Sequence, residues 1–213
     1  MRYVWIDAGN DARGDLRQLY GIDGCFFDVR EDRLNAAYLE GVKAKGYAVG
    51  VYVHVDGWEE TKNLSARAAA EWMAAAVEHV VGSKRTASFP KVQFDIERHD
   101  PGFVLACLGR WRELMPKQDT SWTMEGGQGG WMGPVVKPPA KPSSFVQGIK
   151  ALGIRLVPQL YNGDMTEVWD SLAYARDLTR RGFENARVSP FYDAAHLPVG
   201  WAGFAFTQGR LPQ

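Results

Sequence analysis

The sequence predicts an α/β fold: a small (β/α)8 TIM-like barrel with some shortened helices. Eight segments have the composition of strands, helical segments separate most of them, and this alternation is typical of a parallel sheet. The competing arrangement is an open, doubly wound sheet. Residues 7–10, which follow the first strand, do not match the glycine-rich dinucleotide fingerprint and so count against it. At 213 residues, the chain suits one barrel domain over residues 1–213.

Each predicted element has a local reason. The predicted strands are rich in β-branched and aromatic residues and cover 3–7, 24–29, 47–55, 91–97, 120–125, 154–161, 186–192 and 201–207. Apolar periodicity and alanine content predict helices over 16–19, 31–45, 61–81, 102–114 and 166–181. Gly46 and Gly182 suit helix ends, and Pro101 suits a first helical turn. Glycines and prolines oppose regular structure over 126–144, which is either a lid or binding element or a surface excursion that replaces part of a fifth helix.

Composition and charge exclude several functional classes. Apolar residues make up 46% of the chain and aromatic residues 12%, as in a folded globular protein. Twenty-five Lys and Arg balance 25 Asp and Glu, so electrostatics predict no nucleic-acid partner and no membrane partner. Cys25 and Cys107 lack metal-type spacing, and we expect buried free thiols, with a disulfide as the alternative.

The segment 91–97 contains two candidate catalytic carboxylates. Alternate side chains of a strand share a face, so Asp95 and Glu97 point together. The rise along the strand separates them by roughly 6–7 Å. This is near the distance that glycoside hydrolysis requires between its two carboxyl groups. The alternative is a strand end that runs into a solvated loop.

Other polar residues follow the carboxyl ends of the predicted strands, which surround one mouth of a barrel. Dense donors, acceptors and aromatic rings suit a sugar-binding cleft. The predicted substrate-binding residues are Asp28, Tyr52, His54, Glu125, Gln159, Tyr161, Tyr192 and Gln208. A core role for the tyrosines, a structural role for His54, and pairing of Asp28 with Arg30 or Arg33 remain open.

Asp7 ends the first predicted strand and faces the same mouth. A third acid near Asp95 and Glu97 favours retention of a proton on one member of the set. The alternative for Asp7 is a turn residue that accepts hydrogen bonds from nearby amides. A divalent metal is also conceivable at Asp7, Asp28, His54 and Asp95. Because no zinc-type spacing supports a metal, we expect no metal and no cofactor.

Other catalytic classes lack their motifs. No serine lies in a Gly-x-Ser-x-Gly elbow, neither cysteine has a histidine nearby in the sequence, and no segment resembles a P-loop.

The acids at the ends of the first and fourth strands give the chain a family resemblance. A compact barrel with Asp7 closing the first strand and Asp95-Ile96-Glu97 closing the fourth resembles the lysozymes of glycoside hydrolase family 25. These are muramidases of bacteria and their phages that cut the glycan of peptidoglycan. The resemblance implies that Glu97 is the proton donor, that Asp95 stabilises the positive charge developing on the sugar, and that Asp7 assists. The end of the third strand, residues 51–54, is similar to the family's aromatic-and-histidine strand end.

The chain departs from that family in the turn after its first strand, in its last strand and in the loop over 126–144, which is unfamiliar in that family. The turn after Asp7 lacks the usual Asp-x-Ser sequence. The last strand ends in Thr207 and Gln208, where the family often presents an aromatic-Gln pair and a nearby acid.

These observations predict a lysozyme-like glycoside hydrolase that acts on peptidoglycan or a related polysaccharide by carboxylate general acid catalysis. The alternative, from another class, is a non-catalytic glycan-binding or structural phage tail domain with other phage structural proteins as partners. No signal peptide or membrane span is visible. We therefore expect synthesis in the cytoplasm and action at the bacterial cell wall or in a virion.

Overall fold

A computed structural model describes residues 2–6, 23–30, 34–55, 59–96, 100–124, 144–158, 185–188 and 202–207. Its strands are β1 (Arg2–Ile6), β2 (Gly24–Asp28), β3 (Ala48–His54), β4 (Lys91–Asp95), β5 (Thr120–Met124), β6 (Arg155–Pro158), β7 (Asn185–Val188) and β8 (Ala202–Thr207). Its helices are α2 (Ala36–Ala44), α3 (Ala66–Val81), α4 (Pro101–Leu114) and α5 (Ser144–Ala151), with a 3-10 turn at Gly82–Lys84. Within these ranges, no helix combines the length and apolar character that crossing a bilayer requires.

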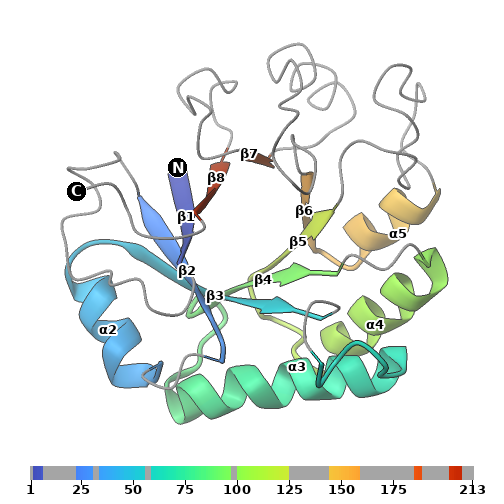
Figure 1. Ribbon diagram of the computed structural model, residues 1–213, viewed down its shortest axis with the longest axis horizontal. Helices are drawn as coiled ribbons and strands as arrows, with labels where there is room; N and C mark the ends of the chain where they lie inside the picture. The colour runs from blue at the N-terminus through green and yellow to red at the C-terminus, as the bar shows by residue number, and fades with distance from the viewer. Residues whose placement is uncertain are drawn as a thin grey trace.

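The strands form an eight-stranded parallel sheet in the order β6-β5-β4-β3-β2-β1-β8-β7. Strand β1 pairs with both β2 and β8, and β6 and β7 at the two ends of this order lie next to one another. Spatial order therefore follows chain order around a ring, with α2 to α5 outside it (Figure 1). A doubly wound sheet reverses its strand order at a switch point, and this sheet does not. The predicted (β/α)8 barrel is confirmed.

The main hydrophobic core lies between the strands and the helices. Because side chains alternate along a strand, β2 directs Cys25 and Phe27 outward, and β4 directs Val92 and Phe94 outward. All four belong to one buried cluster with apolar residues of α2, α3 and α4. The ring of Phe94 meets that of Trp111 of α4 edge to face, with centroids 4.7 Å apart. The outer faces of the strands thus hold the helices in place.

A second, smaller cluster fills part of the barrel interior with Tyr3, Phe26, Tyr52 and Val157. Glycines on β2 and β3 make room for its rings. A Cβ on Gly24 would lie 2.6 Å from Cε1 of Tyr3, and a Cβ on Gly50 would collide with the ring of Phe26. Interior aromatic rings therefore require these two glycines.

Two helices begin later than predicted. The helix expected over 31–45 starts at Ala36, because the side chain of Asn35 accepts a hydrogen bond from the amide of Tyr38 at 3.0 Å. The helix expected over 61–81 starts at Ala66, because Ser65 Oγ accepts from the amide of Ala68 at 3.3 Å. The predicted starts were wrong because a polar N-cap residue fixes the first helical residue at the next position in the chain.

Other boundaries also differ. Helix α5, which was not predicted, begins at Ser144 inside the stretch expected to be irregular. Strand β4 ends at Asp95 rather than at residue 97, and β7 begins at Asn185, one residue before the predicted start; residues 189–192 of that predicted strand lie outside the described residues. The predicted helices at 16–19 and 166–181, and residues 126–143 of the predicted loop, lie outside the described residues.

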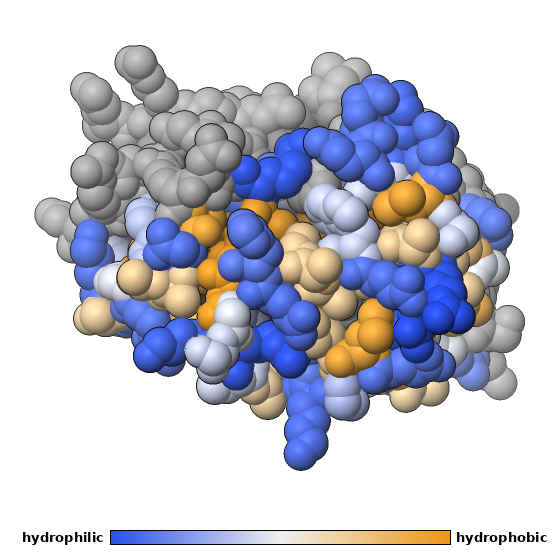
Figure 2. Space-filling model, turned by 90° about the horizontal axis from the view of Figure 1, so that it is seen from below, coloured by the Kyte–Doolittle hydropathy of each residue, from blue (hydrophilic) through white to orange (hydrophobic). Residues whose placement is uncertain are grey.

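The solvent side of α3 is polar. Its exposed residues include Arg67, Glu71, Glu78 and His79. Glu71 accepts hydrogen bonds from Arg67 of its own helix and from Arg110 of α4, and these bonds hold its carboxyl pKa below the ordinary value. Hydrophilic side chains interrupt the apolar areas on the face seen from below in Figure 2, which includes α3.

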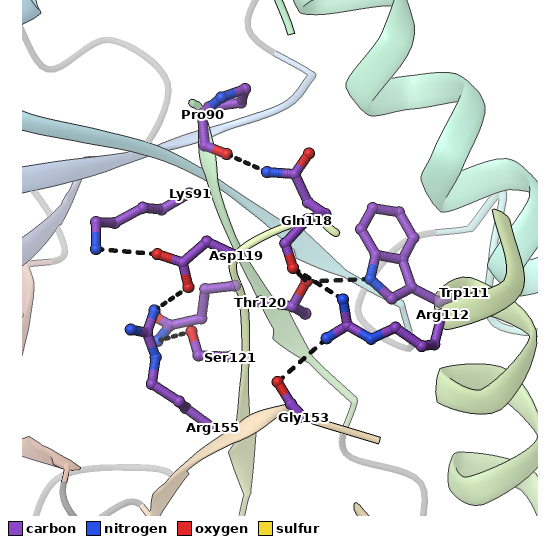
Figure 3. Close-up of polar contacts among 11 residues, drawn as sticks. Pro90, Lys91, Trp111, Arg112, Gln118, Asp119, Thr120, Ser121, Gly153 and Arg155 are labelled. Atoms are coloured by element: carbon purple, nitrogen blue, oxygen red, sulfur yellow. Dashed lines mark hydrogen bonds and ion pairs between the residues drawn. The ribbon is translucent and has the colours of Figure 1, made fainter. Parts of the chain in front are cut away.

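The side chain of Arg112 of α4 contacts both the loop before β5 and the residues that follow α5. Its guanidinium donates to the carbonyl oxygens of Gln118 at 2.9 Å and Gly153 at 3.2 Å (Figure 3). It also donates to the carbonyl oxygen of Leu152 at 2.8 Å. Burial lowers the pKa of this guanidinium from its ordinary value. One side chain therefore ties the loop before β5 to the end of α5.

Replacing Gly50 by alanine tests the barrel interior. The added Cβ would lie 2.9 Å from the carbonyl oxygen of Lys91 and against the Phe26 ring, so we expect a loss of about 1–3 kcal/mol in unfolding free energy. Gly41→Ala is the matched control: its Cβ meets no atom within 4 Å on an exposed helix position, and we expect a gain of about 0.5–1 kcal/mol. Urea denaturation of both variants measures the difference. Equal stabilities would contradict this description of the interior.

Both cysteines are free and buried, as predicted. Burial raises the pKa of the Cys25 thiol from 9.0 to about 12. The native state therefore favours the neutral thiol: this stability is fully present below about pH 9 and is lost as pH rises toward 12. We expect iodoacetamide at pH 8.5 to leave native Cys25 unmodified and to alkylate it in denaturant, measured by mass spectrometry. Exposed Ala75→Cys should react in the native protein, and equal native rates at both positions would contradict the prediction.

Candidate functional site

The candidate site lies at the carboxyl ends of the strands, the rim where barrel enzymes place their chemistry. Asp28 ends β2, His54 ends β3 and Asp95 ends β4. Parallel pairing aligns His54 with Asp95, and the amide of Val55 donates to the carbonyl oxygen of Asp95 at 3.0 Å. The β3–β4 ladder therefore continues to the rim and holds the imidazole and the carboxylate on neighbouring strands.

The direction of Asp95 follows from its neighbours. Val92 and Phe94 belong to the cluster that packs on the helices. Gln93 alternates with them and is in register with Tyr52, a member of the interior cluster. Asp95 shares the face of Gln93 and so points into the barrel, with 3% of its surface exposed. The alternation predicted for residues 91–97 therefore holds along the described residues of β4.

Strands β4 and β5 line the barrel with polar side chains. Register places Gln93 beside Ser121, and Asp95 beside Thr123, and all four residues are buried. Branched apolar side chains usually fill the interior of such barrels. Four buried polar side chains therefore distinguish this part of the interior from the usual apolar filling. We call these four residues the polar wall.

Ionic and hydrogen bonds secure the polar wall from below. Asp119, just before β5, binds Nζ of Lys91 at 3.1 Å and also pairs with Arg155 of β6 (Figure 3). One level higher, Nε2 of Gln93 donates to Oγ of Ser121 at 3.1 Å. Above that level lie Asp95 and Thr123. These contacts join β4, β5 and β6 beneath the rim and restrict the movement of the strand that carries Asp95.

Two other predicted residues have structural contacts. Asp28 pairs with Arg30 at 3.0 Å and accepts the Arg30 backbone amide at 2.9 Å, which is one of the two roles considered for it. Tyr52 is 4% exposed and packs in the interior cluster, so its ring has the core role that was left open. Among the described site residues, the structure thus brings together His54 and Asp95 at the rim.

The remaining predicted site residues lie outside the described part of the chain and stay predictions: Asp7, Glu97, Glu125, Gln159, Tyr161, Tyr192 and Gln208. Within the described ranges, no three His, Cys, Asp or Glu side chains gather closely enough to bind a metal ion. The metal alternative included Asp7, which is not among those residues. Cys25 and Cys107 belong to the core beneath the helices and away from the rim.

Three members of the polar wall were not predicted from the sequence: Gln93, Ser121 and Thr123. Their signal was present. Polar residues alternate with Val92 and Phe94 in one strand and flank Trp122 in the next. Polar positions on the inner face of a barrel strand indicate a site even where they lie before the strand end.

Comparisons with known proteins agree with this architecture. No family model and no curated protein matches the chain. Among solved structures, it is similar to a GH18 chitinase from Pseudoalteromonas aurantia, with a TM-score of 0.56, 12% identity, and coverage of 97% of this chain and 93% of the other. It is also similar to active domain 2 of a thermostable chitinase from Pyrococcus furiosus, with a TM-score of 0.54, 11% identity, and coverage of 95% and 82%. The ICChI chitinase from Ipomoea carnea gives a TM-score of 0.51, 14% identity, and coverage of 95% and 93%. At these identities the likeness shows the fold alone: the chain has the barrel fold found in chitinases.

Proposed function

We propose that this chain is a glycoside hydrolase that acts on a polysaccharide of N-acetylated amino sugars. The observation that carries the proposal is the position of Asp95, a buried carboxylate inside a parallel barrel at the carboxyl end of β4. Asp95 belongs to the polar wall, and His54 lies beside it on β3. Barrel enzymes hold their catalytic groups at such positions.

The proposed acid is Glu97, two residues beyond Asp95 in the sequence. Two nearby carboxyl groups titrate as a coupled pair, and the pair retains one proton over the pH range between its two steps. In the proposed mechanism Glu97 donates that proton to the glycosidic oxygen as the bond to the sugar breaks. Asp95 stays ionised and stabilises the positive charge that develops on the sugar, with Asp7 assisting.

Burial strengthens this role of Asp95. A carboxylate with 3% exposure lies largely out of water, where its attraction to a developing cation is much less screened. The bonds beneath it limit how far its strand can shift. The charge is therefore in place before the reaction begins, and little reorganisation is needed.

Two similarities support the proposed substrate class. Three structures with this fold are named chitinases, and one of them is described in complex with chito-oligosaccharides. The acids at the strand ends resemble those of lysozymes that cut peptidoglycan. Chitin and peptidoglycan both contain N-acetylated amino sugars. GH18 enzymes use the substrate's own acetamido group in catalysis, and an ionised Asp95 would stabilise the cation that forms on that group. The phage setting stays a prediction.

Two substitutions at the proposed site test the function. With chitin oligosaccharides and peptidoglycan as substrates, Glu97→Gln should lower kcat roughly 100–10,000-fold through loss of the proton donor. Asp95→Asn should lower kcat roughly 100–1,000-fold through loss of the stabilising charge. Mass spectrometry of the released fragments measures turnover, and circular dichroism checks that each variant is folded.

The controls are carboxyl-to-amide changes elsewhere. Glu113→Gln alters a side chain with 68% exposure on α4, and Asp100→Asn keeps a residue type that can cap α4. Both should keep wild-type turnover. Wild-type protein that binds these glycans but releases no fragments would overturn the proposal and favour the glycan-binding alternative.

A further inference from the structure

We propose that Thr123 is a positioning residue for Asp95: its hydroxyl donates a hydrogen bond to the ionised carboxylate and holds it in its working orientation. The inference rests on the proposed function, because that function supplies the role of Asp95. It adds a residue from β5 to a site that includes Asp95 of β4 and His54 of β3.

The first observation is the state of the Thr123 hydroxyl. The residue has 0% exposure, and its Oγ1 has no hydrogen-bond partner within the part of the chain that the structure describes. A buried hydroxyl without a partner destabilises a fold, whereas a valine of the same shape would not. Packing alone therefore gives no reason for a threonine here.

The contrast with the other hydroxyls of β5 sharpens this point. Thr120 accepts a hydrogen bond from Nε1 of Trp111 at 3.2 Å and donates to the carbonyl oxygen of Gln118 at 2.9 Å. Ser121 accepts from Gln93. Each of these hydroxyls has a structural partner on its own face of the strand. Thr123 lies closer to the rim than Thr120 and Ser121, and its hydroxyl has no such partner among the described residues.

The second observation is the register of the strands. Thr123 is aligned with Asp95 of β4 on one side and with Val157 of β6 on the other. Neighbouring strands lie about 4.8 Å apart, and rotation about χ1 exchanges the positions of the threonine hydroxyl and methyl groups. Val157 offers no polar side-chain atom. Of the two cross-strand neighbours, only Asp95 has a side chain that can accept a hydrogen bond from the hydroxyl.

Titratable groups also lie on the elements next to Asp95. His54 is aligned with it on β3, Asp28 at the end of β2 pairs with Arg30, and Glu97 follows it in the sequence. On β5, the residue in register with Asp95 is Thr123, which does not titrate. Substitution of Thr123 by valine changes none of these charges, so a change in the titration of Asp95 reports the lost hydroxyl.

The test measures the titration of Asp95 directly. Protein labelled with 13C at aspartate carboxyl carbons is titrated by NMR, and Asp95→Asn assigns the signal. Loss of a hydrogen bond to the charged form raises a carboxyl pKa. We therefore expect Thr123→Val to raise the pKa of Asp95 by about one unit, a tenfold change in proton affinity. Thr123→Ser, which keeps the hydroxyl, should restore the wild-type value.

Kinetics give a second readout. On a glycan that the wild type cleaves, Thr123→Val should move the acidic limb of the kcat profile upward by the same amount and lower kcat about tenfold, with little change in KM. Thr120→Val is the matched control on the outer face of β5. It removes the hydrogen bond with Trp111, so it should lower the melting temperature and leave the pH profile unchanged.

The outcomes separate the two proposals. An unchanged Asp95 titration in folded Thr123→Val overturns the role of Thr123, whatever the protein cleaves. Wild-type protein without turnover overturns the proposed hydrolase, while the NMR titration still reports on the hydrogen bond. If Thr123→Val does not fold, Thr123→Ala provides the same titration, and an unshifted Asp95 pKa in that variant overturns the inference.

Discussion

The pairing of β4 with β3 and β5 is the constraint on which the rest of the site depends. Parallel register decides which side chains enter the barrel, because successive residues point to opposite faces. A slip of one residue would turn Phe94 into the barrel and Asp95 into the apolar layer under the helices. The backbone bond between Val55 and the Asp95 carbonyl oxygen extends the correct register to the rim.

The outer and inner faces of the barrel strands have different roles. Apolar packing against α2, α3 and α4 lies on the outer face, where Phe94 and Trp122 join the main core. That packing leaves part of the inner face available for polar groups. Along β4 and β5 these groups are arranged in levels, with an ionic group around Asp119 at the bottom, a hydrogen bond between Gln93 and Ser121 above it, and Asp95 at the rim. Buried polar groups stabilise a fold only when they are paired, and the lower two levels meet that condition.

Likeness in fold and difference in sequence have a common explanation. At 11–14% identity with the chitinase structures, few side chains are shared, yet the fold is similar over 95–97% of this chain. Barrel architecture depends on where apolar residues recur more than on which ones they are. Function depends on particular side chains at the rim, and these vary independently of the scaffold.

Local patterns in the sequence determined much of the fold. The apolar outer faces of β2, β3 and β4, and the alternation of strands with helices, were enough to predict the barrel. The alternation around Asp95 was enough to predict that this carboxylate points away from the helices. Such patterns succeed because they report on burial, which repeats along a strand or a helix. Helix starts were less predictable, since single caps such as Asn35 and Ser65 decide them against the propensity of the flanking residues.

Only the tertiary structure decided which residues meet. It placed the Tyr52 ring in the interior cluster and brought Thr123 beside Asp95 from a strand 28 positions farther along the chain. The physical reason is that strand register is a non-local property: it arises from the packing of the whole ring and leaves no trace in the residues on either side of a single position.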